Sequence, residues 1–313
     1  MSRSSAVPRD LGFYLRARLN GALRIALGRR ARGPLTPAAS IDEVLGGRPD
    51  PLSLARLVIG RDNQSREVAV AAYLGRTGLP IQQHEFATFE GRGRNFHVDL
   101  GSGDRVLMLI AHHDAVPGSP GANDNAAALG VLLHMIDRLA HRPPTRLRVR
   151  FLFPAAEELG YLGSRVYARE VSLAGVAGVL SLELCGIGDS LVIWDAPGDT
   201  PFLRRVGGAF EALGRRRDES YHVVGRIPVF GSDHRAFADA GIPAYGLSIV
   251  PAREADALRR FVLSPARSAF RAVVQRPAPF DTYHTPRDAL ATLDPAACAA
   301  VADALLAVIA EMG

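Results

Sequence analysis

Five groups of side chains that commonly bind metal ions are spread along this chain. They are His112-His113-Asp114, Asp124, Glu157-Glu158, Glu183 and His284. Most of them follow an apolar, strand-like run, and the ends of such strands share one rim of an open α/β sheet, where ligands bind. All are nitrogen or oxygen donors, which suits zinc, and cobalt or manganese would also be accepted. The sequence therefore predicts one metal site assembled from distant segments.

The pair His112 and Asp114 comes directly after an apolar run. Residues i and i+2 of a strand point to the same side, so the two side chains can touch. A metal-bound imidazole usually donates its second N–H to a carboxylate, which fixes the tautomer of the ring. We therefore expect His112 to bind the metal and Asp114 to orient it, while His113 points away. The alternative is an ordinary His–Asp pair at a strand end.

Carboxylates dominate the next two groups. Asp124 ends a tight loop at a helix start, where it would serve as an N-cap or offer one oxygen to each of two metals. Glu157 and Glu158 follow a buried strand, and adjacent acids there repel each other unless cations balance them. In a metal site one Glu would bind the metal while the other takes the proton of a metal-bound water. The alternative is an exposed loop pair without a function.

Glu183 interrupts an apolar run and needs a partner, either a cation in the cleft or an arginine. His284 lies in Tyr283-His-Thr-Pro-Arg-Asp288, which alone would be an ordinary turn. If Asp124 is shared, the whole set describes two metals about 3.5–4 Å apart, as in two-metal hydrolases.

The elements that must position these groups alternate between strand and helix. The continuous apolar run Arg105–Ala111 is typical of a strand buried on both faces, and a helix is expected over Asn125–His141. Further strands are expected at Ile81–Thr88, Asn95–Leu100, Arg148–Pro154, Gly178–Leu184, Ser190–Trp194 and Pro243–Val250, with helices near 233–240 and 253–271 and from Pro295 to the end. This pattern predicts an α/β protein with three α/β/α layers, in which helices flank a mixed, mostly parallel sheet.

Composition and charge narrow the class of protein. The 313 residues are 48% hydrophobic and 22% charged, and no uninterrupted apolar run reaches 18 residues, so a membrane-spanning helix is not expected. Cys185 and Cys298 form no disulfide pattern, which favours a reducing, cytoplasmic location. Lysine is absent, and residues 1–33 hold eight arginines against one acid, Asp10. The basic character thus belongs to this arm and does not indicate nucleic-acid binding.

Residues 1–35 are expected to form a basic, partly helical arm. Its apolar residues fall mainly on one side of a helix, and arginines interrupt any signal-peptide core. One interpretation is a helix lying on an anionic membrane, peripheral at its inner surface, or on a partner protein. The other is a helix packed on its own domain.

Taken together, the motifs resemble those of metallopeptidase family 28 over roughly residues 52–313. This family of two-zinc exopeptidases holds leucyl-type aminopeptidases, glutamate carboxypeptidases and glutaminyl cyclases. The motifs are AHHDAV (111–116), SPGANDNAA (119–127), AAEELGYLGS (155–164), GSDHRAF (231–237) with GIPA (241–244), and YHTPRD (283–288). The resemblance implies that residues 36–313 form one catalytic domain with the zinc-dependent exopeptidase fold.

The resemblance also implies a role for each residue. His112 and Glu183 would hold one zinc, Glu158 and His284 the other, and Asp124 would bridge them. Glu157 would be the general base and acid, with Asp114 orienting His112. A cis peptide is expected at Asp124-Asn125. Tyr283 would steady the oxyanion, and Asp233 and His234 would line the pocket beside Ser232, although Ser232 or Asp233 would also suit a helix cap.

One residue departs from the family pattern. The family often has Asp where this chain has Glu183, and the extra methylene moves the carboxylate by about 1.5 Å. A single-metal site is therefore an alternative to two zinc ions.

Three functions fit the sequence. The first is a zinc-dependent exopeptidase, most simply an aminopeptidase, that hydrolyses a peptide or small amide with a water activated by Glu157. The second is a glutaminyl-cyclase-like acyltransferase, but that branch tends to have a longer segment after the Glu pair and Trp before the last His, where this chain has Tyr283. The third is a metal-poor, inactive binding or membrane-associated module, against which the retention of Glu157 argues. The oligomeric state is not predicted.

Overall fold

One mixed sheet organises the structure, a computed structural model that describes residues 10–15, 19, 37–228, 230–263, 276–278 and 280–313. Its eight strands lie in the order β1-β2-β4-β3-β5-β8-β6-β7. They are β1 Ile81–Ala87, β2 Arg92–Leu100, β3 Val106–Ile110, β4 Arg148–Phe153, β5 Val176–Leu182, β6 Ser190–Trp194, β7 Tyr221–Val223 and β8 Ala244–Val250. The pairs β3–β4, β3–β5, β5–β8 and β6–β7 are parallel, and β1–β2, β2–β4 and β6–β8 are antiparallel. This confirms the expected mixed sheet, and the short strand β7 is one that the sequence did not indicate.

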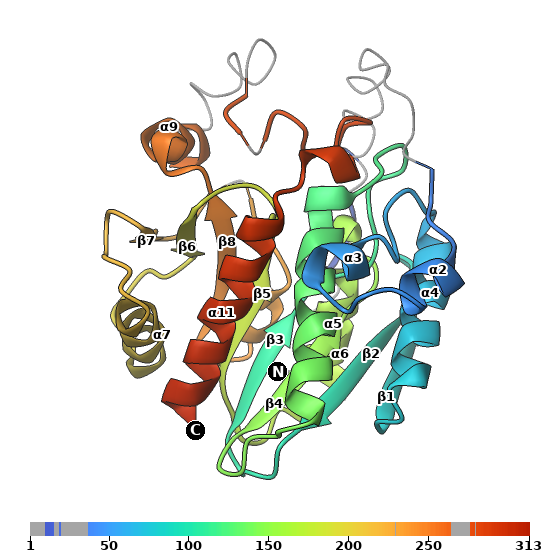
Figure 1. The fold of residues 1–313 in the computed structure, drawn as a ribbon, viewed down its shortest axis with the longest axis horizontal. Helices are drawn as coiled ribbons and strands as arrows, with labels where there is room; N and C mark the ends of the chain where they lie inside the picture. The colour runs from blue at the N-terminus through green and yellow to red at the C-terminus, as the bar shows by residue number, and fades with distance from the viewer. Residues whose placement is uncertain (1–9, 16–18, 20–36, 229, 264–275, 279) are drawn as a thin grey trace.

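Helices cover both faces of this sheet, which confirms the three layers. In Figure 1, α5 and α11 cross in front of the strands and α6 lies behind them. The helices are α2 Ile41–Leu45, α3 Pro51–Ala55, α4 Asn63–Arg76, α5 Ala127–Ala140, α6 Leu162–Glu170, α7 Pro201–Ala212, α8 His234–Ala238, α9 Ala255–Leu263 and α11 Pro295–Met312. The helix expected over 253–271 thus has its first half in α9, and residues 264–271 lie outside the described part of the chain.

Strand β3 shows how the sheet separates two cores. All five of its residues are buried, as the continuous apolar run predicts. Leu107 and Leu109 pack into the large core beneath α5 and α11, while Met108 and Ile110 pack into the smaller core that holds Tyr167 of α6. Alternate side chains of one strand therefore hold the two helical layers to the sheet.

Helix α5 begins later than expected, and helix α11 is long and apolar. The expected helix over Asn125–His141 begins two residues later, at Ala127, because Asp124 and Asn125 have non-helical backbone angles within the preceding turn η2, Ala122–Ala126. α11 is long and apolar enough to cross a membrane, but half of that stretch is buried against the rest of the protein. It packs on α5 and α7 and serves as a core helix.

The described part of the arm packs against the domain. Residues 10–15 are helical, and Asp10 pairs with Arg165 at 2.6 Å and Arg169 at 2.8 Å. Phe13 meets the ring of Tyr161 edge-on at 5.2 Å between centroids. The remainder of the expected arm helix, apart from residue 19, lies outside the described residues.

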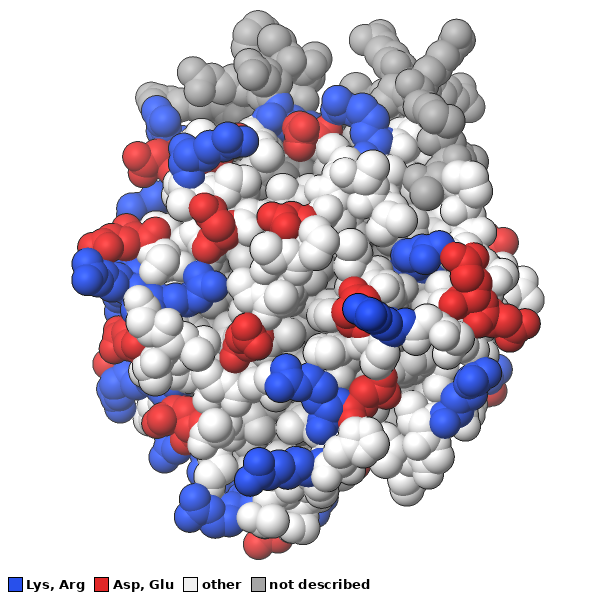
Figure 2. Space-filling view, in the orientation of Figure 1, with Lys and Arg blue, Asp and Glu red and all other residues white. Residues whose placement is uncertain are grey.

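The surface charges on one face of the body are mixed. On the face covered by α3, α5 and α11, arginines alternate with acidic side chains and apolar or neutral surface lies between them (Figure 2). Such interspersed charges form no basic stripe of the kind that tracks a nucleic-acid backbone.

Candidate metal centre

Three of the five side-chain groups leave the sheet at the same edge. β4, β3 and β5 are parallel neighbours, so their carboxyl ends lie side by side. His112 follows β3, the turn η3 (Glu157–Leu159) follows β4, and Glu183 directly follows β5. Asp124 and His284 come to this edge from η2 and from the segment before α11. The structure therefore brings together all five groups that the sequence singled out.

The first donor set consists of His112, Asp124 and Glu183. Nε2 of His112 lies 3.3 Å from Oδ1 of Asp124 and 3.4 Å from Oε2 of Glu183. The other oxygen of Glu183 accepts a short hydrogen bond from Ser232. Despite its extra methylene, Glu183 thus reaches the donor set, and Ser232 fixes its orientation.

The second donor set consists of Asp124, Glu158 and His284. Nε2 of His284 lies 2.7 Å from Oδ2 of Asp124 and 3.1 Å from Oε1 of Glu158. In each set the donor atoms lie within 4.8 Å of one another, close enough to share an ion. Asp124 is common to both sets and turns a different oxygen towards each.

Buried atoms at the centre of these sets lack ordinary partners. Nε2 of His112, Oδ2 of Asp124 and Nε2 of His284 are inaccessible to solvent and make no well-directed hydrogen bond to any residue that the structure describes. An unsatisfied buried polar atom destabilises a fold by about 1–3 kcal/mol. Several such atoms converge here, all of them nitrogen or oxygen, and this donor chemistry fits a bound cation with the preferences of zinc.

The ionisation of these groups follows from their crowding. Burial alone would lower the pKa of His112, but the carboxylates of Glu183, Asp114 and Asp124 outweigh it and raise that pKa well above its usual range. Burial alone would also lower the pKa of His284. The charges of Glu158 and Asp124 outweigh this effect and raise that pKa. Both shifts have the same cause, because the carboxylates around the two rings favour a positive charge at this site.

Glu157 differs from its neighbour in its surroundings. Burial raises the pKa of Glu157 well above its usual range, helped by the charges of Glu183 and Glu158 and opposed by His112. Its side chain lines the pocket next to both donor sets without belonging to either. A carboxyl with a raised pKa at this position is suited to carry a proton.

Asp114 holds the turn that carries the two glutamates. Its carboxylate accepts the backbone N–H of Glu157 at 3.0 Å and that of Glu158 at 3.1 Å. It also lies 3.4 Å from Nδ1 of His112, which contacts the backbone oxygen of Asp114 at 3.1 Å. The expected contact between residues 112 and 114 is present, and His113 turns away towards the backbone oxygen of Arg94.

Two further residues shape the site, and sequence reasoning missed both of them. Asp288 is fully buried and accepts the backbone N–H groups of Asn123 at 2.7 Å and Asp124 at 3.1 Å. These hydrogen bonds hold the loop that contains Asp124. The Asp124–Asn125 peptide in this loop is cis, as the resemblance implied. Asp288 is the last residue of the YHTPRD motif, and its place in that motif was the signal in the sequence that could have indicated it.

Arg66 of α4 is the second missed residue. It is fully buried, and its guanidinium donates to the backbone oxygens of His113, Asp114, Pro120 and Gly121. Burial lowers the pKa of Arg66 to about 10, while nearby acids, Asp114 first among them, oppose that shift. Arg66 thereby ties the His112 loop to the Asp124 loop, and nothing in its local sequence distinguishes it from the chain's other arginines.

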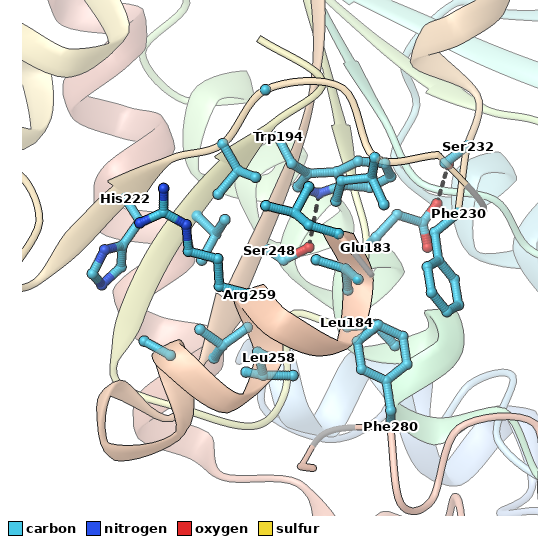
Figure 3. Close-up of a pocket in the computed structure, with 18 of the residues that line it drawn as sticks. Glu183, Leu184, Trp194, His222, Phe230, Ser232, Ser248, Leu258, Arg259 and Phe280 are labelled. Atoms are coloured by element: carbon cyan, nitrogen blue, oxygen red, sulfur yellow. Dashed lines mark hydrogen bonds between the residues drawn. The ribbon is translucent and has the colours of Figure 1, made fainter. Parts of the chain in front are cut away.

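A pocket of about 370 Å³ opens beside the donor sets. Asp124, Glu157 and Glu183 form one end of it, and Tyr283 and Ser232 line it nearby. Figure 3 shows Glu183 hydrogen-bonded to Ser232 on this side. The ring of Tyr283 stacks on that of His284 at 3.5 Å between centroids.

Asp233 and His234 lie outside the pocket that the resemblance implied they would line. Both are fully buried and are not among the residues that line this pocket. Nε2 of His234 bonds to Asp195 at 3.0 Å, and its ring packs edge-on against Trp194. Burial raises the pKa of Asp233 to about 7. Asp233 stands at the start of α8 but makes no capping hydrogen bond with its side chain.

Comparisons with known proteins agree with this geometry. The profile of Peptidase family M28 matches residues 95–309. A probable lipoprotein aminopeptidase, LpqL, of Mycobacterium tuberculosis is 30% identical over 178 residues, which are 51% of this chain and 35% of the relative. The aminopeptidase YwaD of Bacillus subtilis is 43% identical over 67 residues, 21% of this chain and 14% of that one. The chain thus spans about a third or less of the length of these relatives.

Solved structures show the same fold at lower identity. A zinc aminopeptidase from Bacillus subtilis aligns with a TM-score of 0.56 at 24% identity, over 72% of this chain and 52% of that chain. The glutaminyl cyclase of Porphyromonas gingivalis aligns with a TM-score of 0.64 at 17% identity, over 89% of this chain and all of that one. Since the family profile covers more than half of the sequence and its motifs meet at one edge of the sheet, the chain belongs to peptidase family M28.

Proposed function

We propose that this protein is a zinc-dependent exopeptidase and that it acts as an aminopeptidase. The observation that carries the proposal is the pair of donor sets that share Asp124, with Glu157 beside them at the end of a pocket. The names of the relatives, aminopeptidases of M. tuberculosis and B. subtilis, support the same activity. We take residues 36–313 as a single catalytic domain because one sheet unites the strands of this range.

Two zinc ions fit the side chains best. His112, Asp124 and Glu183 would hold one, and Asp124, Glu158 and His284 the other. Their donor atoms converge on two points, where Nε2 of both histidines and Oδ2 of Asp124 make no hydrogen bond to any residue that the structure describes. When bound, zinc polarises a carbonyl group and lowers the pKa of water. A single-ion site would leave one of the two histidine nitrogens buried beside carboxylates without a cation.

The remaining steps fall to the chain's own residues. Glu157 takes a proton from the attacking water, whose oxygen bonds to the scissile carbonyl carbon. As the C–N bond breaks, Glu157 passes this proton to the nitrogen of the leaving amine. Asp114 fixes the backbone of Glu157 during both transfers. Tyr283, which lines the pocket beside His284, is placed to donate a hydrogen bond to the carbonyl oxygen as negative charge develops.

A substrate panel tests this function. Leucine anilide, an N-blocked leucine anilide and a peptide with N-terminal glutamine would be assayed on the purified chain with and without a chelator. The proposal expects cleavage of the free-amine anilide only, lost on chelation and restored by zinc. Cyclisation of the glutamine peptide instead would favour a glutaminyl-cyclase-like enzyme, a class that also shares the fold.

Two variants sharpen the test. Glu157→Gln keeps shape and removes the proton carrier, so we expect kcat to fall by about 10²–10⁴-fold with zinc content unchanged. Glu219→Gln is the matched control, because Glu219 is exposed and its ion pair among the described residues is with Arg216. Less than one zinc per chain, with activity unaffected by Glu157→Gln, would instead indicate a metal-poor module with another role.

We further propose that the arm brings the enzyme to an anionic membrane surface. Asp10, the single acid of residues 1–33, is neutralised by Arg165 and Arg169. Leu11, Leu15 and Leu19 are exposed to 47%, 58% and 62% and are spaced by four residues. Arginines beside exposed leucines suit anionic lipid.

Vesicle sedimentation tests this surface. Binding to phosphatidylglycerol vesicles but not to phosphatidylcholine, weakened by 0.5 M salt and by Leu11→Ser with Leu15→Ser, would support it. Equal binding to both lipids, or none, would contradict it. The expected cytoplasmic location stays a prediction.

A further inference from the structure

The pocket beside the donor sets is larger than one side chain requires. Its volume of about 370 Å³ is more than twice that of a cavity of about 150 Å³ that holds benzene. Figure 3 shows Glu183, Ser232 and Phe230 on one side of it and His222 and Arg259 on the other. An occupant that fills it must therefore extend from the donor sets well past the reach of a leucine side chain.

One wall is a fixed tryptophan. Nε1 of Trp194 donates to Oγ of Ser248 at 3.1 Å, and the indole meets the ring of His234 edge-on at 4.7 Å between centroids. Gly246 leaves room for the indole, because a Cβ there would lie 2.0 Å from its ring atoms. Since Trp194 is held on three sides, this wall presents a flat apolar surface that does not adapt to small occupants.

The opposite wall is also apolar. Phe230, Phe280 and Tyr283 pack against one another, with ring centroids 5.0 Å and 5.4 Å apart. Leu258 and Val262 of α9 continue this wall away from the donor sets. A large apolar group would thus be enclosed between Trp194 and these side chains, where each Å² of apolar surface buried stabilises by about 25 cal/mol.

The far end of the pocket is lined by polar side chains. Arg259 lines it as an exposed residue, and its side chain forms no ion pair or hydrogen bond with any residue in the described ranges. Nε2 of His222 is buried there and likewise has no hydrogen-bond partner in that part of the chain. A guanidinium only donates hydrogen bonds, so Arg259 can donate to an acceptor that the occupant carries.

The charge at this end decides which acceptor fits. Asp218 and Asp256 also line the pocket and, like Arg259, are exposed. Their two carboxylates would repel a further full negative charge. A neutral acceptor, such as a carbonyl or ether oxygen, can take the hydrogen bond of Arg259 without that repulsion.

We propose that this pocket binds, next to the scissile amide, a side chain with a large apolar body and a neutral hydrogen-bond acceptor at its tip. The proposal rests on the proposed function and defines its substrate class. A para-substituted aromatic residue whose substituent carries a carbonyl has this chemistry. Leucine would leave the far half of the pocket unfilled, and a carboxylate tip would meet Asp218 and Asp256.

Matched anilide substrates test the proposal on the zinc-loaded full chain. The p-nitroanilides of leucine, 4-isopropylphenylalanine and 4-acetylphenylalanine separate size from hydrogen bonding, because the isopropyl and acetyl groups have nearly the same shape. We expect kcat/KM to rise from leucine to the isopropyl compound and by about another tenfold to the acetyl compound. Arg259→Met should remove only the last step, whereas Arg260→Met on the same helix should remove none.

A binding measurement does not depend on turnover. Trp194 is the only tryptophan of the chain, so its fluorescence reports occupancy of the pocket. We expect 4-acetylphenylalaninol to change this fluorescence at about tenfold lower concentration than leucinol. Val192→Phe, which adds bulk to a residue that lines the pocket, should abolish the difference.

The outcomes separate the two proposals. If leucine anilide is cleaved but the acetyl compound is neither better cleaved nor more tightly bound, the substrate class is wrong and the aminopeptidase function stands. If no free-amine anilide is cleaved, the function is wrong. The fluorescence titration then still decides whether the pocket selects an acceptor-tipped apolar group.

Discussion

The carboxylate of Asp114 accepts the backbone N–H of Glu157 at 3.0 Å, so a residue at the end of β3 sets the backbone position of a residue after β4. The same carboxylate holds Glu158 through its N–H at 3.1 Å. One buried side chain thus places both the proposed base and a proposed zinc ligand. We therefore expect Asp114 to affect the proposed reaction although it binds no substrate.

Asp114→Asn tests that coupling. The amide keeps one acceptor oxygen and turns an N–H group towards a backbone N–H, so one of the two hydrogen bonds is lost. We expect kcat/KM to fall by about 10–100-fold on leucine anilide, the range found for residues that support metal ligands. Asp99→Asn, which breaks an ion pair with Arg150 away from the site, should leave kcat/KM within about twofold.

Asp288→Asn should weaken zinc binding without abolishing the fold. Asp288 holds the backbone N–H groups of Asn123 and Asp124, and Asp124 belongs to both donor sets. We expect zinc affinity, measured by competition with a chromophoric chelator, to fall by about 10–100-fold. Asp294→Asn is the control, since Asn also caps a helix well and Asp294 caps only α11. Equal zinc affinities for the two variants would contradict this role of Asp288.

Glu183→Asp restores the residue that the family often has, yet should impair this chain. The shorter side chain cannot keep both the contact with Ser232 and the approach to His112. We expect one of two zinc ions to be lost on dialysis, with affinity reduced about tenfold. Ser232→Ala should act in the same direction but more weakly. Tighter zinc binding by the Asp variant would show that Glu183 is a poorer ligand than the structure indicates.

Arg66→Met should be strongly destabilising. It leaves buried backbone oxygens of two loops without donors, and each such group contributes about 1–3 kcal/mol. We expect the free energy of unfolding in urea to fall by at least about 3 kcal/mol. Arg56→Met, which breaks a partly exposed pair with Glu43, should change it by less than about 1 kcal/mol.

His97 makes stability depend on pH. Burial and the charge of Arg150 lower its pKa to about 4, whereas an unfolded histidine titrates near its ordinary value of 6.5. Between these values the unfolded chain binds more protons, so the contribution of neutral His97 is fully present above pH 6.5 and is lost as pH falls towards 4. Metal-free protein should therefore lose stability from pH 7 to 5 more steeply than the His97→Gln variant. Parallel urea-midpoint profiles would contradict this.

The sequence predicted the fold and the five donor groups because their signals are local, and the family resemblance implied how these groups divide into two sets. The apolar run of β3 and the polar residues directly after it are adjacent in the chain, and parallel strands carry their ends to one edge. The role of Arg66 depends on contacts with distant loops, which no local pattern reveals. Asp288 stands in the YHTPRD motif, but its contacts with the Asp124 loop could not be read from that motif. The start of α5 was placed two residues early because the turn at Asp124 has a helical composition without helical backbone angles.

The pocket was the least predictable part. Its far end combines His222 of β7, a strand that was not expected, with Arg259 of α9. Both residues look like ordinary surface residues in the sequence. Only the sheet order, which places β6, β7 and β8 together, brings them to the same cavity.

The position of His284 late in the chain has a consequence for synthesis. The second donor set is incomplete until this histidine has left the ribosome and its segment has reached Asp124 and Glu158. A nascent chain that already displays His112, Glu157 and Glu183 would therefore lack one of the two sites. If the proposed activity needs both donor sets, it would begin only after His284 has been made and has reached them.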